Sequence, residues 1–391
     1  MPRVRALALF SHGPLIVAGP RVPSTLYKRA RPRIGRGQPF PSVTFAHSLH
    51  IARSFRFPSK GTYLGYRASM FVAFPVLSAA IAADVWHDMP GGKQVHESCI
   101  HHFDQPFTVL SSGAVHLQNG TTIHHPPCPL KPRRSARPSA LTAAPAPTPA
   151  LGYYSSWVAY AQAAHADGLG YLSSDFVVPE PPTSRGPAPP LVASSIYLFN
   201  GLEDGMGHAG NGSVILQPVL QFGKSGCLTN PLKHKDWYLT SYLVNGAGRA
   251  YCGANVGPLK PGEALRGAMT LLDGDSGNNT WRVDSTRLST GEVSTTTADM
   301  GALVIDAAYL TLEAMVLYSC AAYPASGSFA FTNNTLLDRR MQPLSAGDDG
   351  GHWQKMLKKT ECAQDVQIAG PGIADPVTIT WSPSSDGSQS Q

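Results

Sequence analysis

Histidines and cysteines gather between residues 96 and 128, and these are residue types that could support chemistry. Five histidines flank two cysteines here: His96, His101 and His102 around Cys99, and His124 and His125 before Cys128. Zinc sites use such residues, but neither spacing matches a closed set of Cys and His ligands. We therefore expect no metal at this place.

Other motifs that bind ions or cofactors are incomplete. The stretch from Asp273 has acidic residues at calcium-loop spacing, but Asn278 stands where that loop requires glycine. The glycine-rich stretch from Glu203 lies between two expected strands, with no helix after it to hold a phosphate. No Gly-x-Ser-x-Gly elbow is found. The sequence thus predicts neither a cofactor nor a metal.

A set of aromatic residues offers a second chemistry, because flat rings on a concave sheet can stack on sugar rings. The set comprises Tyr153, Tyr154, Trp157, Tyr160, Trp237, Tyr238, Tyr242 and Trp281. Most aromatic residues in strands belong to a core. We expect two or three of these to line a cleft, with Trp157, Trp237 and Tyr238 as the candidates.

The elements that must position these residues are strands. Short segments rich in β-branched and aromatic residues alternate with Gly, Pro, Asn and Asp turns, and few stretches keep a helical period. The expected strands lie at 195–199, 212–222, 237–244, 264–272, 280–288 and 308–318. Strands at this spacing without alternating helices predict an all-β fold with antiparallel sheets, arranged as a sandwich or a barrel.

The charge distribution separates the beginning of the chain from the rest. Residues 1–69 contain twelve of the 31 Lys and Arg and no Asp or Glu, so the later residues carry a net negative charge. Nucleic-acid binding is therefore not expected. An apolar run, 70–83, then ends in small residues like a secretory signal peptide and is too short to span a bilayer. We interpret 1–69 as a basic disordered extension that lies upstream of the true translation start at Met70. A mitochondrial-type presequence or a retained signal anchor stays an alternative.

The cysteines and glycosylation sequons agree with a secreted protein. Four Asn-x-Ser/Thr sequons follow the signal-like run, at Asn119, Asn211, Asn278 and Asn333. The six cysteines allow fifteen pairings. We favour the pairing of sequence neighbours, and free thiols remain the alternative: Cys99 with Cys128, Cys227 with Cys252, and Cys320 with Cys362.

Composition divides the remaining chain into four parts. Residues 84–130 form a small Cys- and His-containing pro-segment, and 131–150 form a Pro/Ala linker with a possible processing site at Arg134. Residues 151–370 are long enough to bury a substantial core and form the β-sandwich domain. Residues 371–391 are the carboxyl-terminal tail.

Several strands resemble those of the glutamic peptidase (eqolisin) family, secreted concanavalin A-like β-sandwiches in which a Gln and a Glu activate water. The stretches that carry the resemblance are SSWVAY from 155, GYLSSDFVVPEPP from 170, IYLFNGLED from 196, ILQPVLQFG from 215, WYLTSYLV from 237, PGEALRGAMTLL from 261, and DAAYLTLEAMVLYSCAAYPASGSFAFTNNT from 306. The match covers about 180 residues in short motifs, so its main implication is the fold.

The family's catalytic residues carry over only in part. The Gln falls on Gln217, but the Glu falls on Tyr309, and Leu239 stands where the family has a further Glu. A phenol is a poor general base at acidic or neutral pH. Glu313 follows on the same face of that strand, about 13 Å beyond Tyr309, and is therefore expected to be too distant to pair with Gln217. The resemblance therefore implies a domain that does not cleave peptides by the family's mechanism. Gln217 could face a groove or be a satisfied structural residue.

Three functions remain open on the sequence. The first is a secreted, monomeric pseudoenzyme that binds a glycan or peptide in its cleft, near Tyr309 and Glu313. The second is an active acid endopeptidase with Glu313, Glu203 or Asp204 as the base. The third is a structural cell-surface protein. No membrane span is expected.

Overall fold

The computed structural model describes residues 85–129, 155–184, 194–205, 214–228, 230–274, 279–317, 319–345, 347 and 350–384, all within the unit Ser78–Gln391. The expected basic extension, signal-like run and Pro/Ala linker therefore lie outside the described residues. So do the sequons at Asn211 and Asn278 and the last seven residues.

The described residues form strands and three short 3-10 helices, η1 (Glu97–Cys99), η2 (Pro231–Lys235) and η3 (Cys320–Ala322). One sheet has nine strands, in the order β19 (Gln354–Leu357), β7 (Ser155–Ala164), β17 (Ala307–Met315), β9 (Ser195–Glu203), β10 (Val214–Gly223), β11 (Trp237–Asn245), β12 (Ala250–Cys252) and β3 (Ile100–His102), with β13 (Val256–Leu259) also paired to β11.

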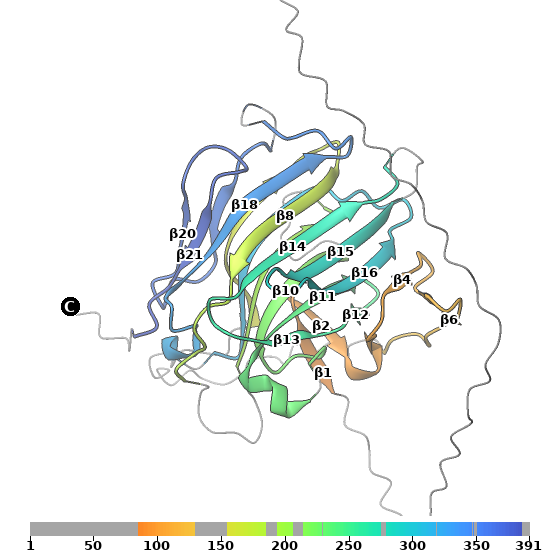
Figure 1. Cartoon of the computed structure of the whole chain (residues 1–391), viewed down its shortest axis with the longest axis horizontal. Coiled ribbons are helices and arrows are strands. Elements are labelled where there is room, and N and C mark those ends of the chain that lie inside the picture. The colour runs from red at the N-terminus through yellow and green to blue at the C-terminus, as the bar shows by residue number, and fades with distance from the viewer. Residues whose placement is uncertain are drawn as a thin grey trace, which may run out of the picture. The chain divides into compact units, whose positions relative to one another are not determined.

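The second sheet has ten strands, and Figure 1 shows its central members side by side. Their order is β20 (Asp365–Ile368), β21 (Val377–Thr380), β18 (Ser328–Asp338), β8 (Leu169–Val177), β14 (Ala264–Leu271), β15 (Thr280–Arg287), β16 (Glu292–Asp299), β4 (Phe107–Val109), β5 (Val115–Leu117) and β6 (Thr122–Ile123). A separate hairpin pairs β1 (Trp86–Met89) with β2 (Lys93–His96).

The two sheets pack face to face around an apolar core, which confirms the antiparallel β-sandwich. Leu198, Leu220 and Leu312 of the nine-stranded sheet share this core with Leu265 and Val283 of the other sheet. All six strands expected from the sequence are present. The ten-stranded sheet alternates buried and exposed residues, as in β14, because the face turned away from the core meets solvent.

The nine-stranded sheet is different because its central strands are buried on both faces. Every residue of β9, β10 and β17 is buried. A second apolar cluster, which includes Met89, Tyr197, Ile215 and Val219, covers the face turned away from the sandwich core. This second face is the one that the hairpin occupies.

Residues 85–129, named here the amino-terminal segment, belong to both sheets. Strand β3 pairs in parallel with β12, and β4 pairs in parallel with β16. All other strand pairs in the described structure are antiparallel. The segment therefore extends an edge of each sheet, although the sequence suggests a separate small unit. At the other end, β21 pairs with β18, so the sheet continues beyond the boundary expected at residue 370.

The three expected disulfides are confirmed. Their Cα separations are 5.8 Å for Cys99–Cys128, 5.8 Å for Cys227–Cys252 and 5.5 Å for Cys320–Cys362. The described cysteines include no free thiol. The first bond closes a loop inside the amino-terminal segment. The other two lie within the rest of the described structure, residues 155–384, named here the main domain. No disulfide therefore joins the segment to the rest.

Replacing both Cys320 and Cys362 by Ala should lower the free energy of unfolding by about 4 kcal/mol. The bond spans 42 residues, and a loop of this size restricts the unfolded chain by roughly that amount. Urea unfolding at neutral pH measures the change, with the exposed Ala325→Ser as a control that should leave stability unchanged. A double variant as stable as the wild type would contradict the expectation.

Candidate active site

The hairpin turn inserts its backbone into the covered face of the nine-stranded sheet. Strand β1 ends at Met89 and β2 begins at Lys93; these two residues pair with each other, and Pro90, Gly91 and Gly92 connect them. The two glycines have φ values of +92° and +70°, which side chains rarely adopt. An added Cβ on Gly91 would lie 2.9 Å from Ile215, so only glycine lets the backbone approach this closely.

Two polar side chains from different strands bind this turn. Gln217 of β10 donates from Nε2 to the Pro90 carbonyl at 2.9 Å. Glu313 of β17 accepts from the N–H of Gly91 at 2.7 Å and from the N–H of Gly92 at 2.8 Å. Both side chains have no solvent exposure. The Pro90–Gly91 peptide group is therefore held at its carbonyl by an amide and at its nitrogen by a carboxyl.

This arrangement corrects the expectation that Glu313 is too distant to act with Gln217. The spacing of about 13 Å measures the distance from Tyr309 along one strand, whereas Gln217 lies on another strand. Since one peptide group contacts both, Gln217 Nε2 and Glu313 Oε2 are at most about 8 Å apart. This upper limit is compatible with a peptide group lying between the two side chains.

Burial and the hydrogen bonds act in opposite directions on Glu313. Burial is the largest cause, and together with the nearby Asp88 and Glu203 it raises the pKa of the carboxyl to about 8. The N–H groups of Gly91 and Gly92 oppose this rise because they stabilise the carboxylate. A buried carboxyl whose pKa lies this far from its ordinary value, in contact with the docked turn, marks a candidate functional group.

A second glutamine lies level with Glu313 across the sheet. On β9, Tyr197 is opposite Gln221 of β10 and also opposite Glu313 of β17. Gln221 and Glu313 therefore occupy one row, two strand spacings or about 10 Å apart at their Cα atoms. Alternation along β10 puts Gln217 and Gln221 on the same face. The repeated Leu-Gln pair, four residues apart, was a signal in the sequence that could have identified Gln221.

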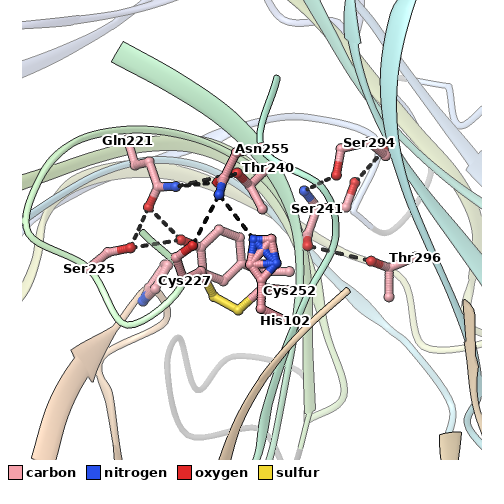
Figure 2. The surroundings of a disulfide bond; sticks show 12 residues. His102, Gln221, Ser225, Cys227, Thr240, Ser241, Cys252, Asn255, Ser294 and Thr296 are labelled. Atoms are coloured by element: carbon pink, nitrogen blue, oxygen red, sulfur yellow. Dashed lines mark hydrogen bonds between the residues drawn. A yellow bond between two sulfur atoms is a disulfide. The ribbon is translucent and has the colours of Figure 1, made fainter. Parts of the chain in front are cut away.

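A buried hydrogen-bond network fixes the Gln221 side chain next to the Cys227–Cys252 disulfide, as Figure 2 shows. Its Oε1 accepts from the hydroxyls of Ser225 and Tyr242. Its Nε2 donates to Thr240 at 3.3 Å and to Asn255 at 3.4 Å. Asn255 in turn donates to His102 Nε2 at 3.1 Å, which links the network to the amino-terminal segment.

Tyr309 is an aromatic core residue. Its ring meets Trp157 edge-on with centroids 4.8 Å apart, and Tyr160 at 6.0 Å. Its hydroxyl makes no hydrogen bond to the described residues. Burial raises its pKa above the ordinary value of a phenol. A phenol that stays protonated in this way cannot accept a proton from water, so Tyr309 does not act as a general base.

The expected aromatic cleft is filled. Trp157, Trp237 and Tyr238 are at most 4% exposed. Trp157 belongs to the covered face, whereas Trp237 and Leu239 belong to the core between the sheets, because alternation along β11 turns them inward. Tyr238 lies near the surface beside Lys233, whose Nζ is 5.3 Å from the ring centroid. These residues do not form an exposed platform for a sugar.

The two expected glycosylation sequons that the structure describes lie on the surface. Asn119 and Asn333 are exposed, and Asn333 donates to Asp175 at 2.9 Å. Among the residues that the structure describes, no three His, Cys, Asp or Glu side chains form a group that could hold a metal ion. No helix in that same part of the chain has the length and apolarity needed to cross a membrane.

Comparisons with known proteins give a match among solved structures. No family model and no curated protein matches the chain. Among solved structures, it is similar to scytalido-glutamic peptidase, crystallised with a peptide-based transition state analog. The identity is 13%, the TM-score is 0.38, and the match covers 59% of this chain and 100% of the other.

Gly91→Ala should weaken hairpin docking by about 1 to 3 kcal/mol more than Gly92→Ala. Both variants place alanine at a positive φ, but only the Cβ at position 91 collides with Ile215, since nothing lies within 4 Å of the one at position 92. Hydrogen exchange of the β1 and β2 amides measures docking. Equal loss of protection in both variants would show that Gly91 does not seat the turn.

Proposed function

We propose that the covered face of the nine-stranded sheet is a peptide-binding active site, and that the protein is an acid endopeptidase whose own hairpin occupies that site. The observation that carries the proposal is the Pro90–Gly91 peptide group, which lies between Gln217 and Glu313. A substrate peptide would present the same carbonyl and N–H groups to the same side chains.

The chemistry requires a base for water and a donor for the carbonyl oxygen. Once the hairpin leaves, water would enter the site and lessen the burial that raises the pKa of Glu313. The fraction of Glu313 present as carboxylate would take a proton from water while the water oxygen attacks the carbonyl carbon. The Gln217 amide would donate to the oxygen on which negative charge develops. Collapse of the intermediate would break the C–N bond, and the proton on Glu313 would pass to the leaving nitrogen.

The docked hairpin would resist this reaction because it engages the base. Both carboxyl oxygens of Glu313 accept from backbone N–H groups of the turn, Oε2 from Gly91 and Oε1 from Gly92. The positive φ angles also bend the chain away from the extended conformation of a typical substrate. The hairpin would therefore act as an occupant that is bound without being cleaved.

Other parts of the sequence analysis support the setting of this function. Three disulfides agree with an oxidising, extracellular location. Exposed Asn119 and Asn333 would be accessible for N-glycosylation. Binding of a glycan has less support, because the aromatic side chains of this set that the structure describes are buried, whereas Tyr153 and Tyr154 lie outside the described residues.

Glu313→Gln should reduce peptide cleavage by at least about 100-fold, because it removes the general base. The matched control is Glu203→Gln. It changes a second fully buried carboxyl, which lies on β9 near Tyr309. It should alter the rate only a few-fold. Both changes are made in the Gly91→Ala protein, so that the site is accessible, and new peptide termini from a denatured protein substrate are identified at pH 3 to 7.

The outcomes separate the three functions. Cleavage that survives Glu313→Gln and is lost in Glu203→Gln would move the base to Glu203. If the Gly91→Ala protein cleaves nothing at any pH but binds a synthetic hairpin peptide, the domain is a binding module. Absence of both cleavage and peptide binding would favour a structural role.

A further inference from the structure

The amino-terminal segment contacts the main domain through histidines that are partly buried. His101 of β3 stacks on His125, with ring centroids 3.5 Å apart and planes inclined by 22°. Tyr251 of β12 lies 5.4 Å from the His101 ring. The Nε2 atoms of both histidines are buried without a hydrogen-bond partner among the described residues. A proton added to either ring would receive no stabilising acceptor there.

The charged groups around this stacked pair also oppose protonation. Arg249 donates to the carbonyl oxygens of His125 at 3.4 Å and Pro126 at 3.0 Å, and so places its positive charge beside both rings. His124 adds to this effect on His125. Burial, the partner ring and Arg249 lower the pKa of His101 to about 4, and burial and Arg249 lower that of His125. The docked segment therefore requires both rings neutral.

His102 imposes the same requirement on the Gln221 network. Its Nε2 can accept from the Asn255 amide only while that nitrogen is unprotonated. The Asn255 orientation is fixed because its Oδ1 accepts from Thr240 at 2.6 Å and its Nδ2 also faces the Cys227 carbonyl. Burial and Lys233 lower the His102 pKa, and Asp104, 3.9 Å away, opposes them.

His87 lies on the hairpin strand that leads to the turn. Burial and Lys224 lower its pKa, with a further lowering from His96, while Glu97 and Asp88 raise it. His87, His102, Lys224 and Glu97 also line one pocket of about 450 Å³ between the segment and the main domain. His87 on the hairpin and His102 on β3 thus both lie at the boundary with the main domain, where burial favours their neutral forms.

We propose that acid opens the site by protonating these histidines, which releases residues 85–102 from the main domain while β4 to β6 stay attached to β16. The proposal rests on the proposed function only for what the opened site then does. Phe103 and the exposed residues 104–106 connect the two parts and provide the point of movement. Because the Cys99–Cys128 bond ties the two parts together, the chain around His125 would move with residues 85–102.

The sign of the effect follows from the lowered pKa. His101 titrates near pH 4 when docked and near 6.5 when released, so its contribution to docking is complete above pH 6.5 and is lost as the pH falls towards 4. Between pH 7 and pH 4 this one group weakens docking by about 100-fold. His87, His102 and His125 act in the same direction.

Glu313 acts in the opposite direction, because its raised pKa favours docking as the pH falls from about 8. Its effect on docking is limited for two reasons. The side chain stays on β17 after release and keeps part of its burial, and the Gly91 and Gly92 N–H groups that lower its pKa leave with the hairpin. The released histidines, in contrast, lose their neighbours in the main domain.

Hydrogen exchange on the whole chain tests the proposal without any measurement of activity. Protection of the β3 amides, relative to β10 amides in the same molecule and corrected for intrinsic exchange, should fall about 100-fold or more between pH 7 and pH 4. The double variant His101→Gln, His125→Gln should lose most of this pH dependence. The control His116→Gln, an exposed histidine of β5, should retain it.

Two results would overturn the proposal: β3 protection that does not change with pH, or a pH dependence that the double variant keeps in full. If the double variant does not fold, the wild-type protein decides the matter by NMR titration of the His101 ring. An apparent pKa near 4 supports the proposal, and one of 6 or above overturns it. Because neither readout requires cleavage, acid release can succeed even if the peptidase function fails.

Discussion

The buried carboxyl of Glu313 is the constraint around which the occupied site is built. A carboxyl in the middle of a sheet that is covered on both faces loses its hydration and needs strong hydrogen-bond donors to compensate. The turn provides two backbone N–H groups; it can approach this closely because residue 91 is a glycine, and both Gly91 and Gly92 adopt a positive φ. The requirement for a donor, the glycine pair and the position of the hairpin are therefore one physical solution.

The sequence predicted the strands because their signals are local. Alternation, β-branched residues and turn residues located the six segments, and proximity in the chain was enough to pair the cysteines. The same reasoning failed for the site, because its contacts are distant in the chain. Pro90 and Gln217 are 127 residues apart, and Gly91 and Glu313 are 222 residues apart. No local pattern connects a Pro-Gly-Gly turn with those two strands.

Motif transfer also did not identify the carboxyl that binds the hairpin turn. A short match around Ala308 assigned the position of the Glu to Tyr309, which proved to be packed among Trp157 and Tyr160. The pairing of β17 with β9 instead puts Glu313 level with Gln221, and this depends on a register that composition cannot supply. The aromatic residues were misjudged for a related reason. No pattern in the strands indicates that the second face of the nine-stranded sheet is covered by residues 85–96.

The two parallel pairings of the amino-terminal segment have a practical consequence for the handling of this protein. Strand β3 completes the edge of one sheet at β12, and β4 completes the other at β16. A recombinant fragment beginning near residue 155 would leave both edges with unpaired N–H and C=O groups, beside an uncovered apolar face. Such edges recruit strands from other molecules. The fragment would therefore be prone to aggregate during refolding, whereas co-expression with residues 85–129 as a separate chain would supply the missing strands.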